Sequence, residues 1–589
     1  MTSNQGLPEW NLQDLYDGQN APELEADLLD AEAKALAFQN LYQGRLAKLD
    51  GFGLSAALEE YEVLSEITSR VMSFAQLLHA THSMDQSVGR FFQTLQERVN
   101  AITAQVLFFT LELNTLDEDI IDAQLSVPAA ARYTSWISGS RIMRPHQLTE
   151  SQEKLLHEKE VVGRNAWVRL FDETLAHLRF ELDGDDKPLT EVLDQLTDKD
   201  AIKREAAGRA LAYSLRDNER IFSMITNTLA KDKEIEDRWR RFKSPAHPRH
   251  LSNHVETNVV EALVNAVRDS YSDLAHRYYG IKAGWMGVEK LDWWDRNAPL
   301  PQNCNRQFTW NESREIVLNA YYDFEPGMAE TARLFFDNGW IDAPPREGKN
   351  PGAFAHPTVP SAHPYVLLNF HGKSRDVMTL AHELGHGVHQ VLAAQQGLLL
   401  SQTPLTLAET ASVFGEMLTF RSMLDKEKDP DRRRVLLAGK VEDMLNTVVR
   451  QIAFHEFETL VHNERKREEL SPERIGDIWI QTQRDSLGPV FNFDDDYRVL
   501  WSYIPHFIHA PFYVYAYAFG DCLVNALYAI FKDGHPGFQE KYMNMLAQGG
   551  RKDHKELLEP FGLDASDPEF WKKGLTVISG FVDELEESL

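Results

Sequence analysis

Apolar residues recur every three or four positions along most of the chain, which is the period of an α-helix that buries one face. Residues 24–29 and 57–64 show this spacing clearly, and nearly all of the first 180 residues follow it. Thr149 is followed three residues later by Gln152, a capping-box pattern that predicts the start of another helix. The pattern therefore predicts a mostly helical protein.

Two stretches break the helical pattern. Residues 180–188 contain an Asp-Gly pair, which predicts a tight turn between short extended pieces. We place a domain boundary there, between an N-terminal helical lobe at 1–185 and the remainder at 186–589. Residues 340–370 are rich in Pro, Gly and His, and their apolar end at 365–370 predicts a short buried strand. A small β-sheet is therefore expected just before the helix that follows.

Composition restricts the partners of the protein. The chain has 589 residues, 43% of them hydrophobic, which is enough for a large core. Its 61 Lys and Arg residues stand against 90 Asp and Glu residues, so the formal net charge is −29. A surface this acidic repels phosphate backbones and anionic lipid headgroups. We therefore expect no nucleic acid and no membrane as a partner.

Cysteine content and apolar segments favour a cytoplasmic location. Cys304 and Cys522 are the only cysteines, so no disulfide framework is expected and a reducing compartment fits best. The N-terminal residues lack the positive start and the apolar stretch of a secretory signal. Residues 510–531 are apolar, but they include Gly520, Asp521 and several tyrosines. We predict that this segment is a buried helix and not a membrane span.

One short motif indicates metal chemistry. His382, Glu383 and His386 have the spacing H-E-x-x-H, on a helix that we expect Ser374 to cap. Histidines four residues apart project from one face of a helix, so both imidazoles can bind one zinc ion. Glu383 lies about 100° around the helix from His382, where it can act as general base on zinc-bound water. A helix with two incidental histidines is the alternative.

A catalytic zinc site needs a third protein ligand and one open position. A metzincin would place a histidine at position 392, which is Leu392, so that class is excluded. Glu409 and Glu416 are the candidates, on a helix that can fold back after Gly397. Thr406 and Glu409 also match a capping box, and the local sequence leaves both interpretations of Glu409 open. Glu416 is a reserve ligand or a carboxylate that orients a ligand histidine.

A second group of polar residues lies in the last hundred residues of the chain. His506, His509, Tyr513 and Tyr517 have the spacing i, i+3, i+7 and i+11, which would place two imidazoles and two phenols on one stripe of a helix. The alternative is a core stripe whose hydroxyl groups bond to neighbours, and spacing alone favours it.

Several ordered motifs together resemble one family, the oligoendopeptidase F branch of the thimet oligopeptidase family of zinc metallopeptidases. The resemblance extends from about residue 151 to the C-terminus, with a weaker start at 10–16. It rests on Thr379 to His389, Leu407 to Ser412, Trp340 to Asp342, Gly352 to Phe354, His363 to Tyr365, Asn369, Ile504 to Phe507 and Pro511 to Tyr517.

This resemblance implies one Zn²⁺ per chain, with His382, His386 and Glu409 as its ligands. It also implies that Glu383 is catalytic.

The resemblance further implies that a histidine and a tyrosine of the C-terminal group bind the substrate backbone and stabilise the oxyanion. His506 takes this role with Tyr513 or Tyr517, although the alignment also permits Tyr515. His509 is a further substrate-binding candidate, in a segment that departs from the family pattern.

The fold of the family is a large, mostly helical, two-lobed zincin-type metallopeptidase with a deep substrate channel. By this resemblance residues 1–185 form a wall of the channel, and residues 186–589 form the catalytic region. The strand expected at 365–370 lies next to the H-E-x-x-H helix, so we expect it to pair with an extended substrate.

The sequence thus predicts a zinc-dependent endopeptidase that hydrolyses internal bonds of short unstructured oligopeptides, by attack of zinc-bound water activated by Glu383. An aminopeptidase or carboxypeptidase of the same chemistry is one alternative, although we find no separate motif that would grip a free amine. A non-catalytic helical scaffold is the other. The sequence predicts neither the cleavage-site preference nor the oligomeric state.

Overall fold

The computed structural model describes residues 6–182, 184–300 and 306–588. The chain forms two compact units, each built from three segments. The first unit contains residues 1–144, 305–426 and 531–563, and the second contains residues 145–304, 427–530 and 564–589. The boundary predicted at residue 185 lies inside the second unit, and as a functional division it stays a prediction.

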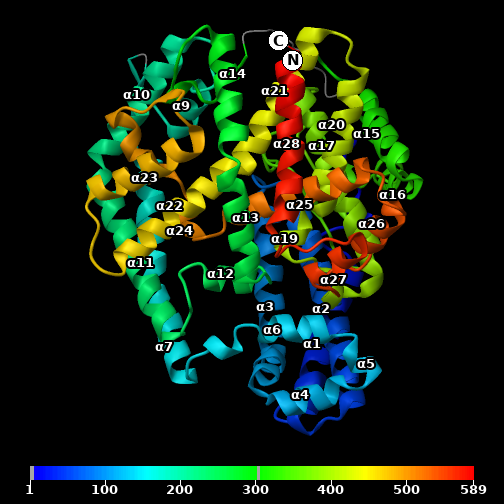
Figure 1. The fold of residues 1–589 in the computed structure, drawn as a ribbon. Coiled ribbons are helices and arrows are strands. Elements are labelled where there is room, and N and C mark those ends of the chain that lie inside the picture. The colour runs from blue at the N-terminus through cyan, green and yellow to red at the C-terminus, as the bar shows by residue number, and fades with distance from the viewer. Residues whose placement is uncertain (1–5, 183, 301–305, 589) are drawn as a thin grey trace. The chain divides into compact units, whose positions relative to one another are not determined.

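The first unit consists mainly of helices (Figure 1). They are α1 (Pro22–Tyr42), α2 (Gly51–Thr81), α3 (Gln86–Thr115), α4 (Glu118–Leu125), α5 (Pro128–Ala131), α6 (Thr134–Arg141), α15 (Trp310–Phe324), α16 (Pro326–Asp337), α17 (Ser374–Ala393), α18 (Leu398–Ser401), α19 (Leu405–Ala408), α20 (Thr410–Lys426), α26 (Phe538–Leu546) and α27 (His554–Leu558). The long helices α1, α2 and α3 pack against one another, and Leu28, Leu58 and Phe109 are fully buried in their shared core.

The second unit is also helical, with two small pairs of strands. Its elements are α7 (Glu150–Glu160), α8 (Arg164–His177), β1 (Phe180–Leu182), β2 (Asp185–Lys187), α9 (Leu189–Gln195), α10 (Ala201–Asp217), α11 (Glu219–Trp239), α12 (His247–Ser252), α13 (Thr257–Asp269), α14 (Arg277–Met286), β3 (Leu291–Asp292), α21 (Pro430–Thr447), α22 (Val449–Arg465), α23 (Pro472–Leu487), β7 (Phe491–Asn492), α24 (His506–His509), α25 (Tyr515–Lys532) and α28 (Pro568–Glu587). Helices make up 71% of the protein and strands 3%, so the predicted mostly helical fold is confirmed.

Three local predictions in the second unit are confirmed. Thr149 and Gln152 form the capping box at the start of α7. Strands β1 and β2 pair antiparallel as the predicted extended pieces, and Asp183 of the predicted turn lies outside the described residues. The apolar segment near residue 520 forms α25, most of whose residues are buried, including Cys522. Within the described residues, every helix is too short or too polar to span a lipid bilayer.

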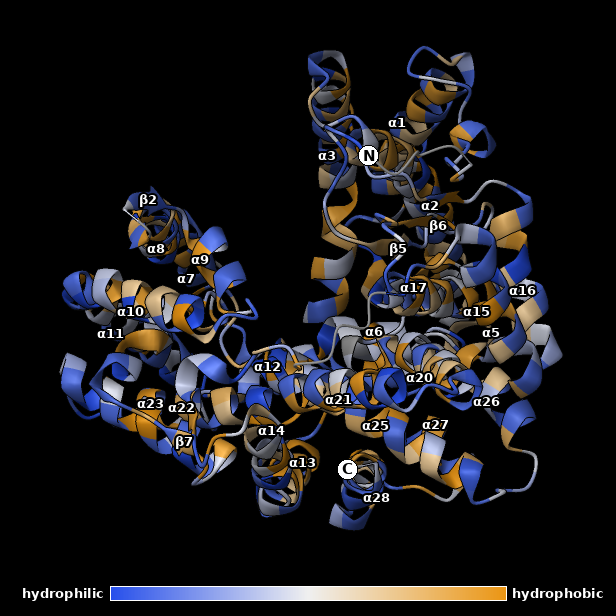
Figure 2. Ribbon diagram, turned by 90° about the horizontal axis from the view of Figure 1, so that it is seen from above, coloured by the Kyte–Doolittle hydropathy of each residue, from blue (hydrophilic) through white to orange (hydrophobic). Residues whose placement is uncertain are grey.

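A three-stranded sheet precedes α17, as predicted from the Pro- and Gly-rich stretch. Its order is β4–β6–β5, with β4 (Ile341–Asp342) parallel to β6 (Tyr365–Leu367) and β5 (Phe354–His356) antiparallel to β6. Figure 2 places β5 and β6 beside α17. The expectation that the strand at 365–370 pairs with substrate is wrong, because β6 already has a partner on both sides.

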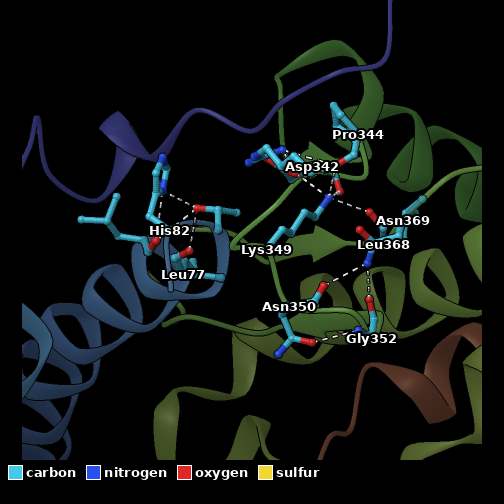
Figure 3. Close-up of polar contacts among 12 residues, drawn as sticks. Leu77, His82, Asp342, Pro344, Lys349, Asn350, Gly352, Leu368 and Asn369 are labelled. Carbon is cyan, nitrogen blue, oxygen red and sulfur yellow. Dashed lines mark hydrogen bonds and ion pairs between the residues drawn. The ribbon is translucent and has the colours of Figure 1, made fainter. Parts of the chain in front are cut away.

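A buried lysine stabilises this sheet through hydrogen bonds to backbone oxygens (Figure 3). The Lys349 ammonium donates hydrogen bonds to the backbone oxygens of Asp342, Pro344 and Leu368, and it lies 2.7 Å from the Asp342 carboxylate. Burial lowers the pKa of Lys349, while the hydrogen bond and charge of Asp342 oppose this shift. The side chain of Asn369 adds bonds to the backbone oxygens of Asn350 and Gly352. These bonds connect the irregular loop at 343–352 to β4 and to the residues that directly follow β6.

Helices α17 and α20 pack closely because small residues lie at their contact. A Cβ atom added at Gly385 would collide with the backbone oxygen of Ala411. The hydroxyl of Tyr321 donates to the backbone oxygen of Ala381, 2.5 Å away, and a Cβ atom at Gly415 would collide with that same hydroxyl. The spacing of the two helices is therefore set by two glycines and one tyrosine.

We expect Gly385→Ala to lower the melting temperature of the protein. The added methyl meets backbone atoms that cannot rotate away, and such overpacking typically costs about 1–3 kcal/mol. The matched control is Gly89→Ala in α3, where nothing lies within 4 Å of the new methyl. This control should be neutral or stabilising by up to about 1 kcal/mol, since glycine weakens a helix. Equal melting temperatures for the two variants, by circular dichroism, would contradict the packing argument.

Candidate metal centre

The two histidines of the H-E-x-x-H motif lie one turn apart on α17, as the spacing predicts. The ring centroids of His382 and His386 are 4.9 Å apart. The helix begins one residue earlier than predicted, because Lys373 and not Ser374 occupies the N-cap position. The Asp376 carboxylate accepts the backbone N–H groups of Lys373 and His371. This acidic first turn, and not a serine hydroxyl, fixes the start of the helix.

Glu409 lies at the junction of two helices and faces both imidazoles. It follows the last residue of α19 and precedes Thr410, the first residue of α20. Its Oε2 atom is 3.4 Å from Nε2 of His382 and 3.4 Å from Nε2 of His386. The Ser412 hydroxyl donates to the same oxygen at 2.7 Å. The capping-box interpretation is wrong, because Pro404 occupies the N-cap position of α19.

Glu416 lies on the other side of the first histidine. Its Oε2 atom is 3.4 Å from Nδ1 of His382, the nitrogen that does not face Glu409. A carboxylate at Nδ1 fixes the tautomer and orientation of an imidazole whose Nε2 binds a metal. The geometry thus separates the two acidic candidates that the sequence left open.

The charges in this cluster favour a cation between the imidazoles. Burial lowers the pKa of His382, but a hydrogen bond to Glu416 and the charges of Glu409 and Glu383 raise it overall. Burial likewise raises the pKa of Glu409, but the hydrogen bond and charge of His386, with the charge of His382, lower it to about 2. Glu409 is therefore ionised at neutral pH and available as a ligand.

His382, His386 and Glu409 fit a tetrahedral metal ion. Among the described residues they form the group of three metal-binding side chains whose ligand atoms all lie within 4.8 Å of one another. Ligands at about 2.0–2.1 Å from a tetrahedral ion are separated by about 3.3–3.4 Å, the distance found from Glu409 to each imidazole. Two imidazoles and a carboxylate suit zinc, and also cobalt or manganese.

Glu383 lies beside this group and is 7% exposed. Burial raises the pKa of its carboxyl group, whereas the charges of His382 and His386 and a hydrogen bond with the Ala355 backbone of β5 oppose this shift. A carboxylate with a raised pKa next to a metal group is well placed to accept and release a proton.

The C-terminal histidines and tyrosines do not form the single helical stripe that their spacing predicts. α24 ends at His509, because Pro511 disfavours a helical conformation at Ala510, which has φ −140° and ψ 69°, and cannot donate a helical hydrogen bond. Phe512 then adopts a positive φ of 59°, and its N–H donates to the buried Glu458. Pro511 was the signal in the sequence that the spacing argument overlooked.

The structure brings together three of these four residues within the second unit. Nε2 of His506 is 3.3 Å from the hydroxyl of Tyr517, and the rings of Tyr513 and Tyr517 are 5.3 Å apart. His509 instead pairs with Asp172 at 2.8 Å. Tyr515 is fully buried, and its hydroxyl accepts a hydrogen bond from Asn253. Tyr515 is therefore the least suited of the tyrosines to contact a substrate.

Sequence reasoning missed residues that complete the surroundings of the metal group. Ser412 supplies the hydroxyl at Glu409, and Gln390 donates to the backbone oxygen of Ala355 in β5. His389 is buried, with Nε2 3.3 Å from the hydroxyl of Thr403. Its position three residues after His386, on the same helix face, was an available signal.

We expect Glu409→Ala and Glu416→Ala to differ in their effect on metal content. Loss of a ligand should leave the protein without stoichiometric metal, whereas loss of a residue that orients a ligand should weaken affinity by about 10- to 100-fold. The control is Glu315→Ala, at an exposed position of α15. The measurement is zinc content by mass spectrometry with a competing chelator. Metal loss in Glu416→Ala alone would reverse the two assignments.

Comparison with known proteins identifies related chains. The model of peptidase family M3 matches residues 195–577, and a model described as oligopeptidase F matches residues 112–180. Oligopeptidase PepF of Bacillus subtilis is 26% identical over 598 residues, which covers 98% of this chain and 87% of the relative.

Solved structures share the fold. One from Chlamydophila abortus has a TM-score of 0.89 at 22% identity, covering 99% of this chain and 98% of the other. The oligoendopeptidase F of Enterococcus faecium has a TM-score of 0.67 at 22% identity, covering 96% and 99%. The family model spans well over half of the sequence, and the motifs around its H-E-x-x-H helix lead to the same family. The chain belongs to peptidase family M3, in the oligoendopeptidase F branch that its sequence predicts.

Proposed function

We propose that the protein is a zinc-dependent endopeptidase that cleaves internal bonds of short, unstructured oligopeptides. The observation that carries the proposal is the convergence of His382, His386 and Glu409, with Glu383 beside them. Membership of a peptidase family supports hydrolysis of peptides, and the donor set supports one zinc ion per chain. A cytoplasmic location is part of the proposal, because the chain has only two cysteines.

Zinc in this site would supply Lewis acidity, which lowers the pKa of a water molecule and polarises the scissile carbonyl. His382, His386 and Glu409 would hold it, and Glu416 would keep His382 in the tautomer whose Nε2 is free to bind. Glu383 accepts the proton of the attacking water and delivers it to the leaving amine. Its raised pKa suits both transfers, because the carboxyl group can release the proton again.

His506 and Tyr517 are proposed to donate hydrogen bonds to the substrate backbone and to the oxygen on which charge develops. Burial, with the charge of Arg450, lowers the pKa of His506, so its imidazole is neutral at neutral pH and carries one N–H. Tyr513 packs against Tyr517, and Arg249 lies 5.5 Å from the ring of Tyr513. We propose that Tyr513 positions Tyr517 or contacts the substrate itself.

The proposal also assigns different roles to the N-terminal and the remaining part of the chain, as the sequence predicts. Residues 1–185 would form a wall of a substrate channel, and residues 186–589 would carry the catalytic groups. Such a channel would admit extended peptides and exclude folded proteins. The acidic composition agrees with peptides as partners and opposes nucleic acid.

Glu383→Gln should lose turnover while it keeps its metal. The amide cannot accept a proton, and removal of a general base typically costs about 100- to 10,000-fold in rate. Hydrolysis of a quenched fluorescent peptide and zinc content are measured on the same sample, with Glu315→Gln as the surface control. Unchanged turnover in Glu383→Gln would exclude it as the base.

A peptide with an acetylated N-terminus and an amidated C-terminus should be cut at an internal bond, and a chelator should abolish the cut. Aminopeptidases and carboxypeptidases need a free end, so cleavage of the blocked peptide separates the proposal from both alternatives. The products are identified by mass spectrometry from a mixed peptide library. Cleavage only of peptides with free ends would show an exopeptidase, and no metal-dependent cleavage at all would favour the scaffold.

A further inference from the structure

A cavity of about 550 Å³ adjoins the second histidine of the metal group, entirely within the first unit. One wall is the face of α17 that continues beyond His386, with His389, Gln390 and Ala393. The segment 398–408, which leads to Glu409, forms another wall. A volume of this size lies within the range of about 300–1,000 Å³ typical of ligand sites. The cavity is therefore large enough for the bulkiest amino-acid side chains.

The lining of this cavity carries no formal charge. None of the described residues that line it is Asp, Glu, Lys or Arg, although the chain as a whole has a net charge of −29. Most of the lining residues are apolar, among them Trp340, Val359, Val391 and Leu398. A charged group that entered would lose hydration without gaining a partner, whereas an apolar group would gain free energy from burial.

The third wall is a rigid loop at residues 357–364. It contains three prolines, which fix φ. Thr358 adopts a positive φ of 55°, which is strained for a β-branched residue. Its hydroxyl donates to the backbone oxygen of His363 at 2.7 Å, and its N–H donates to His356 at 3.0 Å. Backbone strain held in place by such bonds is common at ligand-binding sites.

The stacking of two rings stiffens the same wall. The indole of Trp340 and the imidazole of His363 are 3.8 Å apart and nearly parallel. Nε2 of His363 lies 2.9 Å from the carboxylate of Asp14. A wall fixed before the ligand arrives can select by shape, because little ordering remains to be done on binding.

We propose that this cavity is a specificity subsite that binds a large uncharged side chain of the substrate, on one side of the cleaved bond, and excludes Asp, Glu, Lys and Arg there. The inference rests on the proposed function, because it assigns the cavity beside the metal group to that substrate. This proposed preference differs from what the net charge of the chain alone would suggest, namely a preference for cationic residues at every position of the peptide.

The first experiment uses the zinc-loaded protein and one blocked peptide with a single cleaved bond. The residue on each side of that bond is replaced in turn by Ala, Leu, Phe, Lys and Glu. At one of the two positions we expect Leu and Phe to exceed Lys and Glu by at least about tenfold in kcat/KM. Equal cleavage of Lys, Glu and Leu peptides at both positions would overturn the subsite. Absence of metal-dependent cleavage for every peptide would instead contradict the proposed function.

Two variants that introduce opposite charges at one lining residue test whether this cavity determines the side-chain selectivity. Gln402 lines the cavity but is exposed, so it tolerates substitution. Gln402→Glu should raise the Lys-to-Leu ratio of kcat/KM by about two- to fivefold, and Gln402→Lys should raise the Glu-to-Leu ratio similarly, as expected for one partly exposed ion pair. The two variants are controls for each other. Ratios that do not respond to the sign of the charge would place the selectivity elsewhere.

A variant with a larger side chain in the cavity tests whether the cavity volume determines the preference for large side chains. Ala362 lines the cavity, whereas the adjacent Ser361 is exposed and does not. Ala362→Trp should reduce the preference for Phe over Ala, and Ser361→Trp should leave it unchanged. If Ala362→Trp does not fold, the Gln402 pair decides the question. An unchanged preference in a folded Ala362→Trp protein would overturn the proposal.

Discussion

The metal centre depends on how closely α17 can approach α20. Its two histidines lie on the first helix, and its carboxylate directly precedes the second. Gly385 has no side chain at the point where it meets the backbone of Ala411, two residues beyond Glu409. Any wider separation would move the carboxylate away from both imidazoles together. The relative positions of the three candidate ligands are thus a consequence of helix packing. Contacts between the ligands themselves are not needed to maintain these positions.

The electrostatic design of the site complements this packing. Three carboxylates, from Glu383, Glu409 and Glu416, surround the imidazoles, and each occupies a different position around them. Glu409 faces the Nε2 atoms, Glu416 faces Nδ1 of His382, and Glu383 is buried beside the Ala355 backbone. A metal ion entering such a site competes with protons for the imidazoles, so its affinity falls as the solution becomes acidic.

The sequence predicted the features that depend on residues close together in the chain. It did not predict the features that depend on contacts between residues far apart in the chain. The H-E-x-x-H pair and the capping box at Thr149 follow from residues within one or two turns of each other. The sheet before α17 follows from the composition of one continuous stretch. The choice between Glu409 and Glu416 could not be made from spacing, because it depends on which nitrogen of His382 each carboxylate meets.

Another prediction was wrong because a single residue interrupts a helix that the periodic pattern predicts. Pro511 ends α24, so spacing by threes and fours no longer placed His506 and Tyr517 on one helix. They lie near each other through the path of the loop instead. The cavity beside His386 had no local signal, since its walls come from three segments that are separated in sequence.

The third donor of the metal group lies at a junction between helices and not within one. Its place is therefore set by the connection that runs from Gly397, through α18 and α19, to Thr410. The same connection lines the cavity that we propose binds a substrate side chain. Changes in its length or stiffness would alter metal affinity and side-chain selectivity together, without touching any donor. One short stretch of chain thus links the two properties.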